Sequence, residues 1–299
     1  MKIAIAIATS DRPEILGKTL TQLLRQSRQP DAIYICTPDV EIPTLHIPCN
    51  WPSSALTKSN KLVQLTAPRG LTRQRNAMLS KLQNKFDIVT FIDDDFIPAT
   101  NYLELVERDF KANSDWAVIM GHVQFDGARN AGYGFDEGLA LLATASKCAA
   151  STTTVLDHVG AYGCNMSIRL ETVSGTRFDE RLPLYGWQED IDFTSQLRTR
   201  GRIAGPQYLV GVHLGTRAGR SSGVRFGFSQ IVNPIYLMRK GTMPRAFGIK
   251  LMSRNIAANL ARSVRPEPYI DRRGRLRGNI LAFWQLLHGK VEPEHILKL

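Results

Sequence analysis

Four short apolar runs, separated by turns and helix-like segments, constrain the fold of this chain most strongly. The runs cover residues 2 to 8, Ala32 to Cys36, Leu62 to Leu65 and Ile88 to Ile92. Leucines at helical spacing follow the first run between residues 14 and 26, and a second helical segment, Thr72 to Leu82, follows the third. Short strands that alternate with helices are typical of a doubly wound sheet. We therefore expect an α/β fold with a Rossmann-like, mostly parallel central sheet and flanking helices, which binds its ligands at the carboxyl ends of the strands.

Three consecutive aspartates, Asp93, Asp94 and Asp95, stand directly behind the run Ile88 to Ile92. Neighbouring carboxylates raise one another's pKa, so a close cluster is usually stabilised by a cation, and Mg²⁺ and Mn²⁺ accept oxygen ligands. In an extended chain Asp93 and Asp95 point to one side and Asp94 to the other. Such a pair can hold a divalent cation and leave coordination positions free for phosphate oxygens. The plainer alternative is a solvated turn at the end of a strand.

The basic residues are concentrated in the last third of the chain. Of the 299 residues, 1 to 199 carry 20 Lys and Arg against 23 Asp and Glu, a net of −3, whereas 200 to 299 carry 18 against 4, a net of +14, which gives +11 in all. Such a block can meet nucleic acid, anionic lipid head groups or phosphorylated substrates, and composition alone does not choose between them.

Cysteine usage and the N-terminal sequence bear on the compartment. The four cysteines, Cys36, Cys49, Cys148 and Cys164, form no CxxC and no metal-like spacing, which favours reduced thiols in a cytosolic protein. The apolar run at residues 3 to 8 is too short for a signal peptide, and no apolar segment approaches the length of a membrane span. We expect a cytoplasmic protein that is either soluble or peripheral on the inner face of the membrane.

The later chain gives a more mixed pattern. The expected elements are a helix from Tyr102 to Phe110, a strand from Ala117 to Val123, a glycine-rich loop from Gly127 to Gly138, a helix from Leu139 to Ala149, a strand from Gly160 to Ile168 and a helix that ends near Gly201. A loop from Gly215 to Arg225, rich in Gly, Ser and Arg, should be mobile. The last segment reads as helical from Ile231, with a break between Arg265 and Arg277.

The common nucleotide and hydrolase motifs are missing, because the sequence has no Walker A sequence, no GxGxxG behind the first strand, no HExxH and no GxSxG. Four other pieces remain: Thr9, Asp11 and Arg12 behind the first strand, the segment Gly70 to Asn76, the triple aspartate, and Trp187 to Asp190. In order and spacing these pieces resemble the family 2 glycosyltransferases, which have the GT-A fold, over roughly residues 2 to 215.

The resemblance implies a GT-A catalytic domain over residues 1 to 215. Residues 1 to 100 would bind the nucleotide-sugar, and residues 101 to 215 would bind the acceptor and carry the catalytic base. A flexible loop and a basic, mainly helical extension would follow in residues 216 to 299.

The implied donor is a nucleotide-sugar, most often a UDP-sugar in this family. The residues expected to bind it are Thr9, Arg12, Asp39, Gly70, Arg73, Arg75, Asn76, Asp93 and Asp94. An acidic residue usually follows the second strand in this family. Asp39 is the only candidate here, and the residues Cys36-Thr-Pro displace it from the usual position. Arg217 and Arg220 are expected to close on the diphosphate, and a solvated linker is the alternative for their loop.

Asp93 to Asp95 resemble the DxD motif, and His213 resembles the histidine that completes the metal site in many GT-A enzymes. We therefore expect Asp93, Asp95 and His213 to hold Mn²⁺ or Mg²⁺. Loss of a sugar from a nucleoside diphosphate leaves negative charge on the departing phosphate, which a divalent cation neutralises. A lone histidine is otherwise most often a surface or core residue, and a nitrogen ligand favours Mn²⁺ over Mg²⁺.

Glu189 and Asp190 resemble the ED motif, whose acid removes the proton from the acceptor hydroxyl. Successive helix residues point about 100° apart, so the two carboxylates cannot do the same work. We assign Asp190 as the base and Glu189 as a residue that orients the acceptor or substitutes for the base. Acids in a first helical turn are also stabilised by the helix dipole without any function. Tyr185 and Trp187 are expected to stack on a sugar, and core packing is the alternative.

The C-terminal segment has an apolar stripe, Ile249, Met252, Ile256 and Leu260, that either lies on anionic lipid or packs on its own domain. The basic run Arg272 to Arg277 and the lipid-linked acceptors common in the family favour lipid.

Together these features predict a metal-dependent, inverting transferase that moves a sugar to a glycan or lipid-linked acceptor in polysaccharide or glycoconjugate biosynthesis. A sugar-phosphate nucleotidyltransferase, which also uses paired aspartates and metal, is the enzymatic rival. A basic nucleic-acid-binding protein is the other rival, although nucleic acid is not expected because the basic tail has few aromatics for stacking. The oligomeric state stays open.

Overall fold

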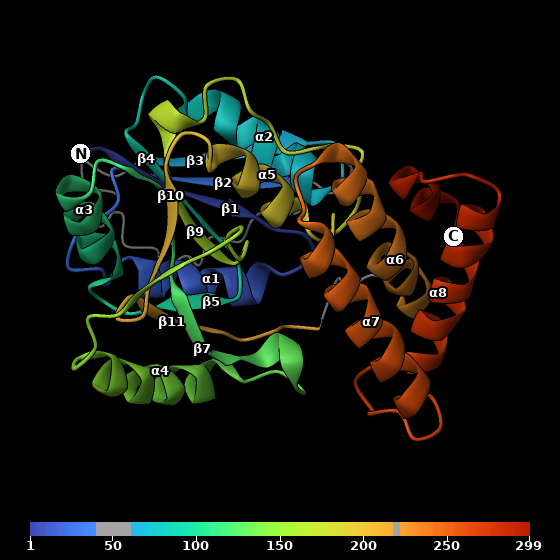
Figure 1. Ribbon diagram of the computed structural model, residues 1–299. Coiled ribbons are helices and arrows are strands. Elements are labelled where there is room, and N and C mark those ends of the chain that lie inside the picture. Colours follow the sequence, from blue (N-terminus) through green and yellow to red (C-terminus); the bar gives the residue numbers. More distant parts are fainter. Residues whose placement is uncertain (40–60, 218–221) are drawn as a thin grey trace.

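The computed structural model describes residues 1–39, 61–217 and 222–299. Within these residues an eight-stranded, mostly parallel sheet forms the centre of the molecule (Figure 1). In spatial order its strands are β3 (Lys61–Ala67), β2 (Ala32–Pro38), β1 (Ile3–Ala8), β4 (Ile88–Ile92), β9 (Asn165–Arg169), β6 (Trp116–Met120), β10 (Arg202–Pro206) and β8 (Val155–Asp157). Only β9 and β8 pair antiparallel with their neighbours.

Helices cover both faces of this sheet, as the alternation along β1 requires. Its isoleucines pack with α1 (Pro13–Leu23) and α3 (Tyr102–Ala112) on one face. Its alanines belong to the cluster on the other face, with α2 (Leu71–Leu82) and α5 (Glu189–Leu197). The helices leave the carboxyl ends of the parallel strands for polar side chains.

A smaller sheet lies beside the end of β4. It consists of β5 (Phe96–Pro98), β11 (Val210–His213) and β7 (His122–Asp126), and α4 (Phe135–Ala149) packs against it. Only Asp93 to Asp95 lie between the end of β4 and the start of β5, so the aspartate turn connects the two sheets.

The C-terminal part is a bundle of α6 (Gly223–Lys240), α7 (Arg245–Arg262) and α8 (Arg272–Leu287), which lies beside α5 in Figure 1. α6 and α8 approach closely because glycines face each other. A Cβ on Gly227 would lie 2.0 Å from the carbonyl oxygen of Arg275, and one on Gly278 would lie 2.1 Å from that of Val224. Short 3-10 turns cover Gly127–Arg129, Leu170–Thr172 and Pro293–Lys298.

Several expected boundaries were wrong, mostly where tertiary contacts set them. The strand expected from Ala117 to Val123 is two strands, β6 and β7, which belong to different sheets. The chain changes sheets at Gly121, where a Cβ would lie 2.4 Å from the Tyr102 hydroxyl. Three helices begin earlier than expected. α4 begins at Phe135 rather than Leu139, α6 begins at Gly223 rather than near Ile231, and α8 begins at Arg272, inside the expected break.

The C-terminal region is helical, as expected. Of the apolar stripe expected on α7, Met252 and Ile256 pack within the bundle, whereas Ile249 and Leu260 are exposed. No described helix combines the length and the apolar composition that a membrane span requires. The division into functional parts at residues 100 and 215 stays a prediction.

Candidate functional site

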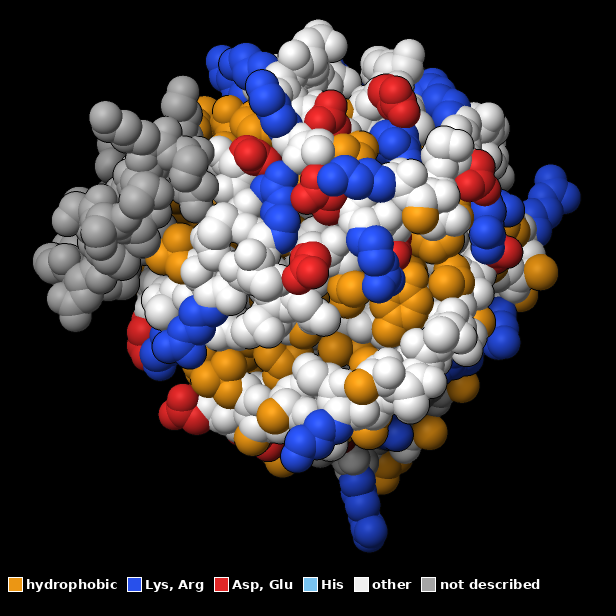
Figure 2. All heavy atoms as spheres, turned by 90° about the vertical axis from the view of Figure 1, so that its left-hand side faces the viewer, with side chains coloured by type: hydrophobic (Ala, Val, Ile, Leu, Met, Phe, Trp, Pro, Cys, Tyr) orange, Lys and Arg blue, Asp and Glu red, His pale blue; other side chains and the backbone are white. Residues whose placement is uncertain are grey.

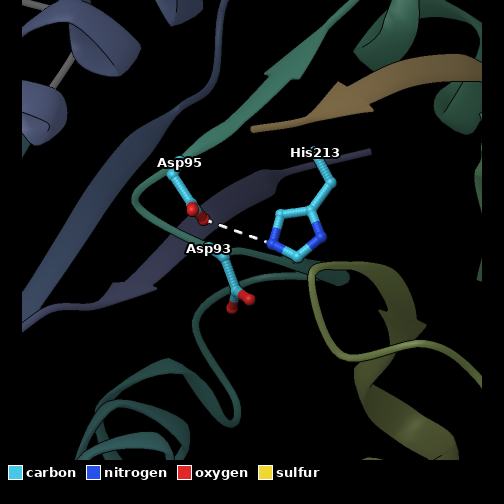
Figure 3. A group of neighbouring side chains, drawn as sticks. All are labelled: Asp93, Asp95 and His213. Atoms are coloured by element: carbon cyan, nitrogen blue, oxygen red, sulfur yellow. Dashed lines mark ion pairs between the residues drawn. The ribbon is translucent and has the colours of Figure 1, made fainter. Parts of the chain in front are cut away.

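The predicted metal ligands lie together where β4 and β11 end. Carboxylate oxygens of Asp93 and Asp95 and a ring nitrogen of His213 all lie within 4.8 Å of one another (Figure 3). His213 Nε2 is 3.4 Å from Asp95 Oδ1. The side chains of Asp95 and His213 are buried, whereas that of Asp93 is 28% exposed. The group is therefore accessible from the Asp93 side.

This donor set fits a divalent cation. Ligands of one octahedral ion with bonds of about 2.1 Å lie about 3 Å apart, so Asp95 Oδ1 and His213 Nε2 are already near that spacing. Burial lowers the pKa of His213, but hydrogen bonds to Asp126 and Asp95 raise it to about 10, because these carboxylates favour positive charge at this position. In the described part of the chain this is the only such group of three metal-binding side chains.

Asp126, the last residue of β7, holds the His213 ring from its other side. Asp126 Oδ1 is 2.9 Å from His213 Nδ1, and the Tyr162 hydroxyl is 3.2 Å from the same nitrogen. The amide of Ala128 donates to Asp126 Oδ1 at 3.1 Å. A carboxylate on one ring nitrogen fixes the ring and leaves the other nitrogen for a metal. Asp126 was not predicted from the sequence, where its only signal is its place immediately before the glycine-rich loop.

Asp94 points away from this group and ties the first-strand loop to the aspartate turn. Asp94 Oδ2 accepts the Thr9 hydroxyl at 2.6 Å, and its Oδ1 accepts Arg12 Nη1 at 3.0 Å. The Thr19 hydroxyl donates to the Asp94 carbonyl at 2.7 Å. Burial raises the pKa of Asp94 to about 7, although Arg12 and Thr9 oppose the rise. Two of the expected donor residues, Thr9 and Arg12, thus bind a third, Asp94.

We call Asp93, Asp95 and His213 the metal group. Arg75 is buried between the metal group and the acids of α5. Its Nη1 pairs with Glu189, and its Nη2 lies 3.2 Å from Asp93 Oδ1 and 2.8 Å from the Gly163 carbonyl oxygen. Only 3% of the Arg75 side chain is exposed. A guanidinium enclosed in this way fixes the positions of the carboxylates on either side of it.

Asp190 and Glu189 occupy different environments in the first turn of α5. Asp190 is half-buried, and it accepts the amides of Gly163 at 2.7 Å and Ile191 at 2.8 Å. Burial raises the pKa of Asp190, and these hydrogen bonds and Arg75 oppose the rise. Glu189 is 3% exposed, and burial raises its pKa to about 8 against the attraction of Arg75. As helix geometry requires, only one of the two acids is bound to Arg75.

The turn before α5 has a strained backbone. Leu184, Gly186 and Gln188 have φ angles of 58°, 57° and 74°, a region that non-glycine residues rarely adopt. Neighbouring elements hold the turn: the Leu71 amide donates to the Leu184 carbonyl at 2.8 Å, and Asn233 Nδ2 donates to the Trp187 carbonyl at 2.8 Å. Strain of this kind persists only where the surroundings enforce it, and it is common at functional sites.

The two aromatics expected to bind acceptor differ in exposure. Tyr185 is 51% exposed, whereas Trp187 is half-buried. Both rings lie near Phe226 of α6, with centroid distances of 6.3 Å for Tyr185 and 5.7 Å for Trp187. Trp187 therefore joins the turn to the bundle, and Tyr185 offers the more accessible ring face.

Other expected donor residues lie around α2. Asn76 exchanges hydrogen bonds with the backbone of Phe178, at 2.9 Å in each direction, and Arg73 Nε is 3.6 Å from Glu180 Oε2. Gly70 precedes α2 with a φ of 142°, which a side chain would strain. Asp39 is exposed behind β2.

The loop behind His213 is bound to the metal group at its first residues. The Thr216 amide donates to Asp95 Oδ2 at 2.6 Å, and Arg12 Nη2 donates to the Thr216 carbonyl at 3.4 Å. Arg217 donates to the carbonyls of Asn130 and Tyr269. Arg220 lies outside the described residues.

Comparison with known proteins identifies the fold. No family model and no curated protein matches the sequence. Among solved structures, TarS (residues 1–349) from S. aureus in complex with UDP-GlcNAc matches with a TM-score of 0.59 and 12% identity, over 95% of this chain and 81% of that one. The same TarS fragment with UDP matches at 0.56 and 14% identity, over 90% and 76%. The mannosyltransferase PcManGT from Pyrobaculum calidifontis in complex with GDP-Man and Mn²⁺ matches at 0.52 and 15%, over 99% and 84%. These matches confirm the expected GT-A fold class.

Proposed function

We propose that this protein is a metal-dependent, inverting glycosyltransferase of the family 2 type that uses a nucleoside diphosphate sugar. The observation that carries the proposal is the Arg75 bridge. It joins Asp93 of the metal group to Glu189, the neighbour of the expected base Asp190. A transferase needs its leaving-group site and its base at a fixed separation, with the sugar between them. The likeness in fold to structures with UDP-GlcNAc and GDP-Man supports this donor class.

In the proposed reaction Asp190 accepts the proton of the acceptor hydroxyl as the oxygen attacks the anomeric carbon. The bond to the donor diphosphate breaks on the opposite side, so the anomeric configuration inverts. Two backbone amides fix the carboxylate of Asp190, and its burial makes it more basic than an exposed aspartate. A divalent cation, Mn²⁺ or Mg²⁺, held by Asp93, Asp95 and His213 would supply the positive charge that stabilises the departing diphosphate.

The remaining donor contacts are proposed from the same arrangement. Asp94 binds Thr9 and Arg12, so we assign it to holding the first-strand loop in shape for the nucleotide. Asp39, Gly70, Arg73 and Asn76 stay predicted donor residues, as do Arg217 and Arg220 for the diphosphate. UDP is the proposed nucleotide.

For the acceptor we propose a glycan or a lipid-linked glycan, in polysaccharide or glycoconjugate biosynthesis in the cytoplasm. The exposed ring of Tyr185, beside the strained turn and the acids of α5, supports sugar stacking there. Trp187 would hold the turn and contribute its edge.

A screen of nucleotide-sugars by thermal shift, with and without Mn²⁺, tests the donor and metal assignments, because a ligand that binds the native state raises the melting temperature. We expect a UDP-sugar to stabilise the protein only when Mn²⁺ is present. Release of UDP from the donor would support glycosyl transfer, whereas release of pyrophosphate would support the rival nucleotidyltransferase.

Asp190→Asn tests the base. The amide keeps the shape of the side chain but cannot accept the proton, so transfer should fall by at least about 100-fold while donor binding is unchanged. Asp136→Asn, an exposed acid in the first turn of α4, is the matched control and should keep full activity. Near-normal transfer by Asp190→Asn would remove the assignment.

A further inference from the structure

The outward side of α8 carries a row of exposed apolar side chains. Ile280, Phe283, Trp284 and Leu287 occupy positions i, i+3, i+4 and i+7, which keeps them on one side of a helix. Their exposed fractions are 61%, 45%, 60% and 85%. Arg273 and Arg277 lie on the same side, about two turns and one turn before the row. We call these six residues the α8 outer face.

The opposite side of α8 already has its partner. Gly278, Asn279, Ala282 and Gln285 are buried in the bundle, and Ala282 belongs to the same apolar cluster as residues of α6. The close contact at Gly278 fixes how α8 lies on α6. The bundle therefore does not need the outer face for its own packing. Because the buried side includes the polar residues Asn279 and Gln285 while the outer face is apolar, the sequence of α8 has no ordinary amphipathic pattern that would reveal this surface.

The charged residues within the three bundle helices all have one sign. α6, α7 and α8 contain three, four and four Lys and Arg residues and no Asp or Glu. On the side of the molecule away from this bundle, by contrast, basic and acidic side chains are intermixed (Figure 2). Val264, which is 77% exposed, lies near the basic end of α8, since Arg273 Nε donates to the carbonyl of the adjacent Ser263 at 3.0 Å.

We propose that the α8 outer face docks on an anionic lipid membrane. Trp284, Phe283 and Leu287 would enter the boundary between head groups and acyl chains, and Arg273 and Arg277 would bind lipid phosphates. Tryptophan suits this boundary because its ring is apolar and its N–H is polar. A second copy is a poorer partner, because its own α8 contains no Asp or Glu that could pair with Arg273 and Arg277. Nucleic acid would leave the row of apolar side chains in water.

Docking through α8 would also fix how the proposed catalytic residues are oriented relative to the membrane surface. Lys240, the last residue of α6, is 2.7 Å from a carboxylate oxygen of Asp192 in α5, and Asn233 of α6 binds the turn that leads into α5. The bundle is thus attached to the helix that carries Asp190. Membrane binding itself does not depend on the proposed glycosyl transfer.

Flotation with vesicles tests the proposal without donor or acceptor. The full chain should float with vesicles of equal parts phosphatidylglycerol and phosphatidylcholine at low salt, and binding should fall at high salt and with phosphatidylcholine alone. The double variant Trp284→Ser/Leu287→Ser should bind at least about tenfold more weakly, because two apolar side chains no longer enter the bilayer. Arg273→Glu/Arg277→Glu should show a similar loss at low salt.

Two control variants match these changes. Leu156→Ser removes an apolar side chain of 45% exposure on β8, and Lys147→Glu reverses an exposed charge on α4. Both should bind vesicles like the natural chain, and all variants should keep its melting temperature because the altered side chains are exposed. Absence of flotation at low salt would overturn the proposal, as would equal losses in the control and α8 variants. A dimer in lipid-free solution that Trp284→Ser/Leu287→Ser dissociates would overturn it in favour of a second copy.

Discussion

His213 and Asp126 are paired across neighbouring strands, with His213 Nδ1 2.9 Å from Asp126 Oδ1. The two residues are in register in the parallel pair β11 and β7, so the backbone itself brings them side by side. The ring is held on its Nδ1 side and presents Nε2 to Asp95. This relationship supports the proposal that His213 is a metal ligand rather than an ordinary core histidine.

Removing the Asp126 carboxylate should weaken metal binding. In Asp126→Ala the ring of His213 loses the partner that orients it, and loss of such a partner typically lowers metal affinity by about 10- to 100-fold. Calorimetric titration of Mn²⁺ into the donor-free protein measures this directly. Asp136→Asn, on the exposed first turn of α4, should bind Mn²⁺ like the natural chain. Unchanged affinity in Asp126→Ala would mean that His213 is not a ligand.

Arg75 should be needed for stability as well as for the site. Above pH 8, where Glu189 is charged beside Arg75, Arg75→Met leaves this buried carboxylate without its cation, which we expect to lower the free energy of unfolding by roughly 3 to 5 kcal/mol. The double variant Arg75→Met/Glu189→Gln should recover part of this loss, because the remaining side chain is neutral. Urea unfolding measures both. The control Arg73→Met, at a side chain that is 43% exposed, should change the free energy by no more than about 0.5 kcal/mol. If Arg75→Met lowered the free energy of unfolding by no more than the Arg73→Met control, the bridging role of Arg75 would be contradicted.

Lys240 should stabilise the contact between α5 and the bundle in a pH-dependent way. It lies 2.7 Å from both Asp179 and the fully buried Asp192, which also accepts the Thr242 hydroxyl at 2.6 Å. In Lys240→Met we expect a loss of about 2 to 3 kcal/mol at neutral pH, since Thr242 still binds the Asp192 carboxylate.

The sign of the pH effect follows from Asp192. Burial raises its pKa, and Lys240 and Thr242 oppose the rise, so without Lys240 the pKa should rise further. Between the ordinary aspartate pKa and this raised value the folded state binds more protons than the unfolded state, so stability falls as pH rises. The deficit of Lys240→Met should thus be small in acid and complete above the raised pKa. Urea unfolding across a range of pH measures this deficit, with Arg239→Met as the control. A deficit in Lys240→Met that does not change with pH would refute this explanation.

Gly163 should be required for its lack of a side chain. A Cβ there would lie 3.0 Å from Arg75 Nη1 and 3.1 Å from the Asp190 carboxylate, so both groups would have to shift by a few tenths of an ångström. Because catalysis is sensitive to small displacements of a base, Gly163→Ala should lower the turnover number by about tenfold with a smaller effect on melting temperature. Gly134→Ala is the matched control, because a Cβ there meets no atom within 4 Å. Full turnover in Gly163→Ala would argue against Asp190 as the base.

Local sequence pattern was sufficient where an element depends on its own residues. The strands at residues 3 to 8, 32 to 38 and 88 to 92 and the helices α2 and α3 were predicted nearly to their ends, because alternation and helical spacing report which side chains face the core. The grouping of Asp93, Asp95 and His213 was also predicted, through the resemblance of their motifs. The split of one apolar run into β6 and β7 was not, because a change of sheet depends on contacts with Tyr102 and Asn165 that are distant in sequence.

By itself, then, the sequence determined the α/β class. It also determined that polar residues gather at the carboxyl ends of the parallel strands, and of which types, since these features follow from periodicity and composition. Only the tertiary structure decided how the charges are divided. It turned Asp94 toward Thr9 and Arg12, enclosed Arg75 between Asp93 and Glu189, added Asp126 behind His213, and left the apolar row of α8 uncovered. The physical reason is that burial and ion pairing depend on which residues meet across the fold, and spacing along the chain does not specify those partners.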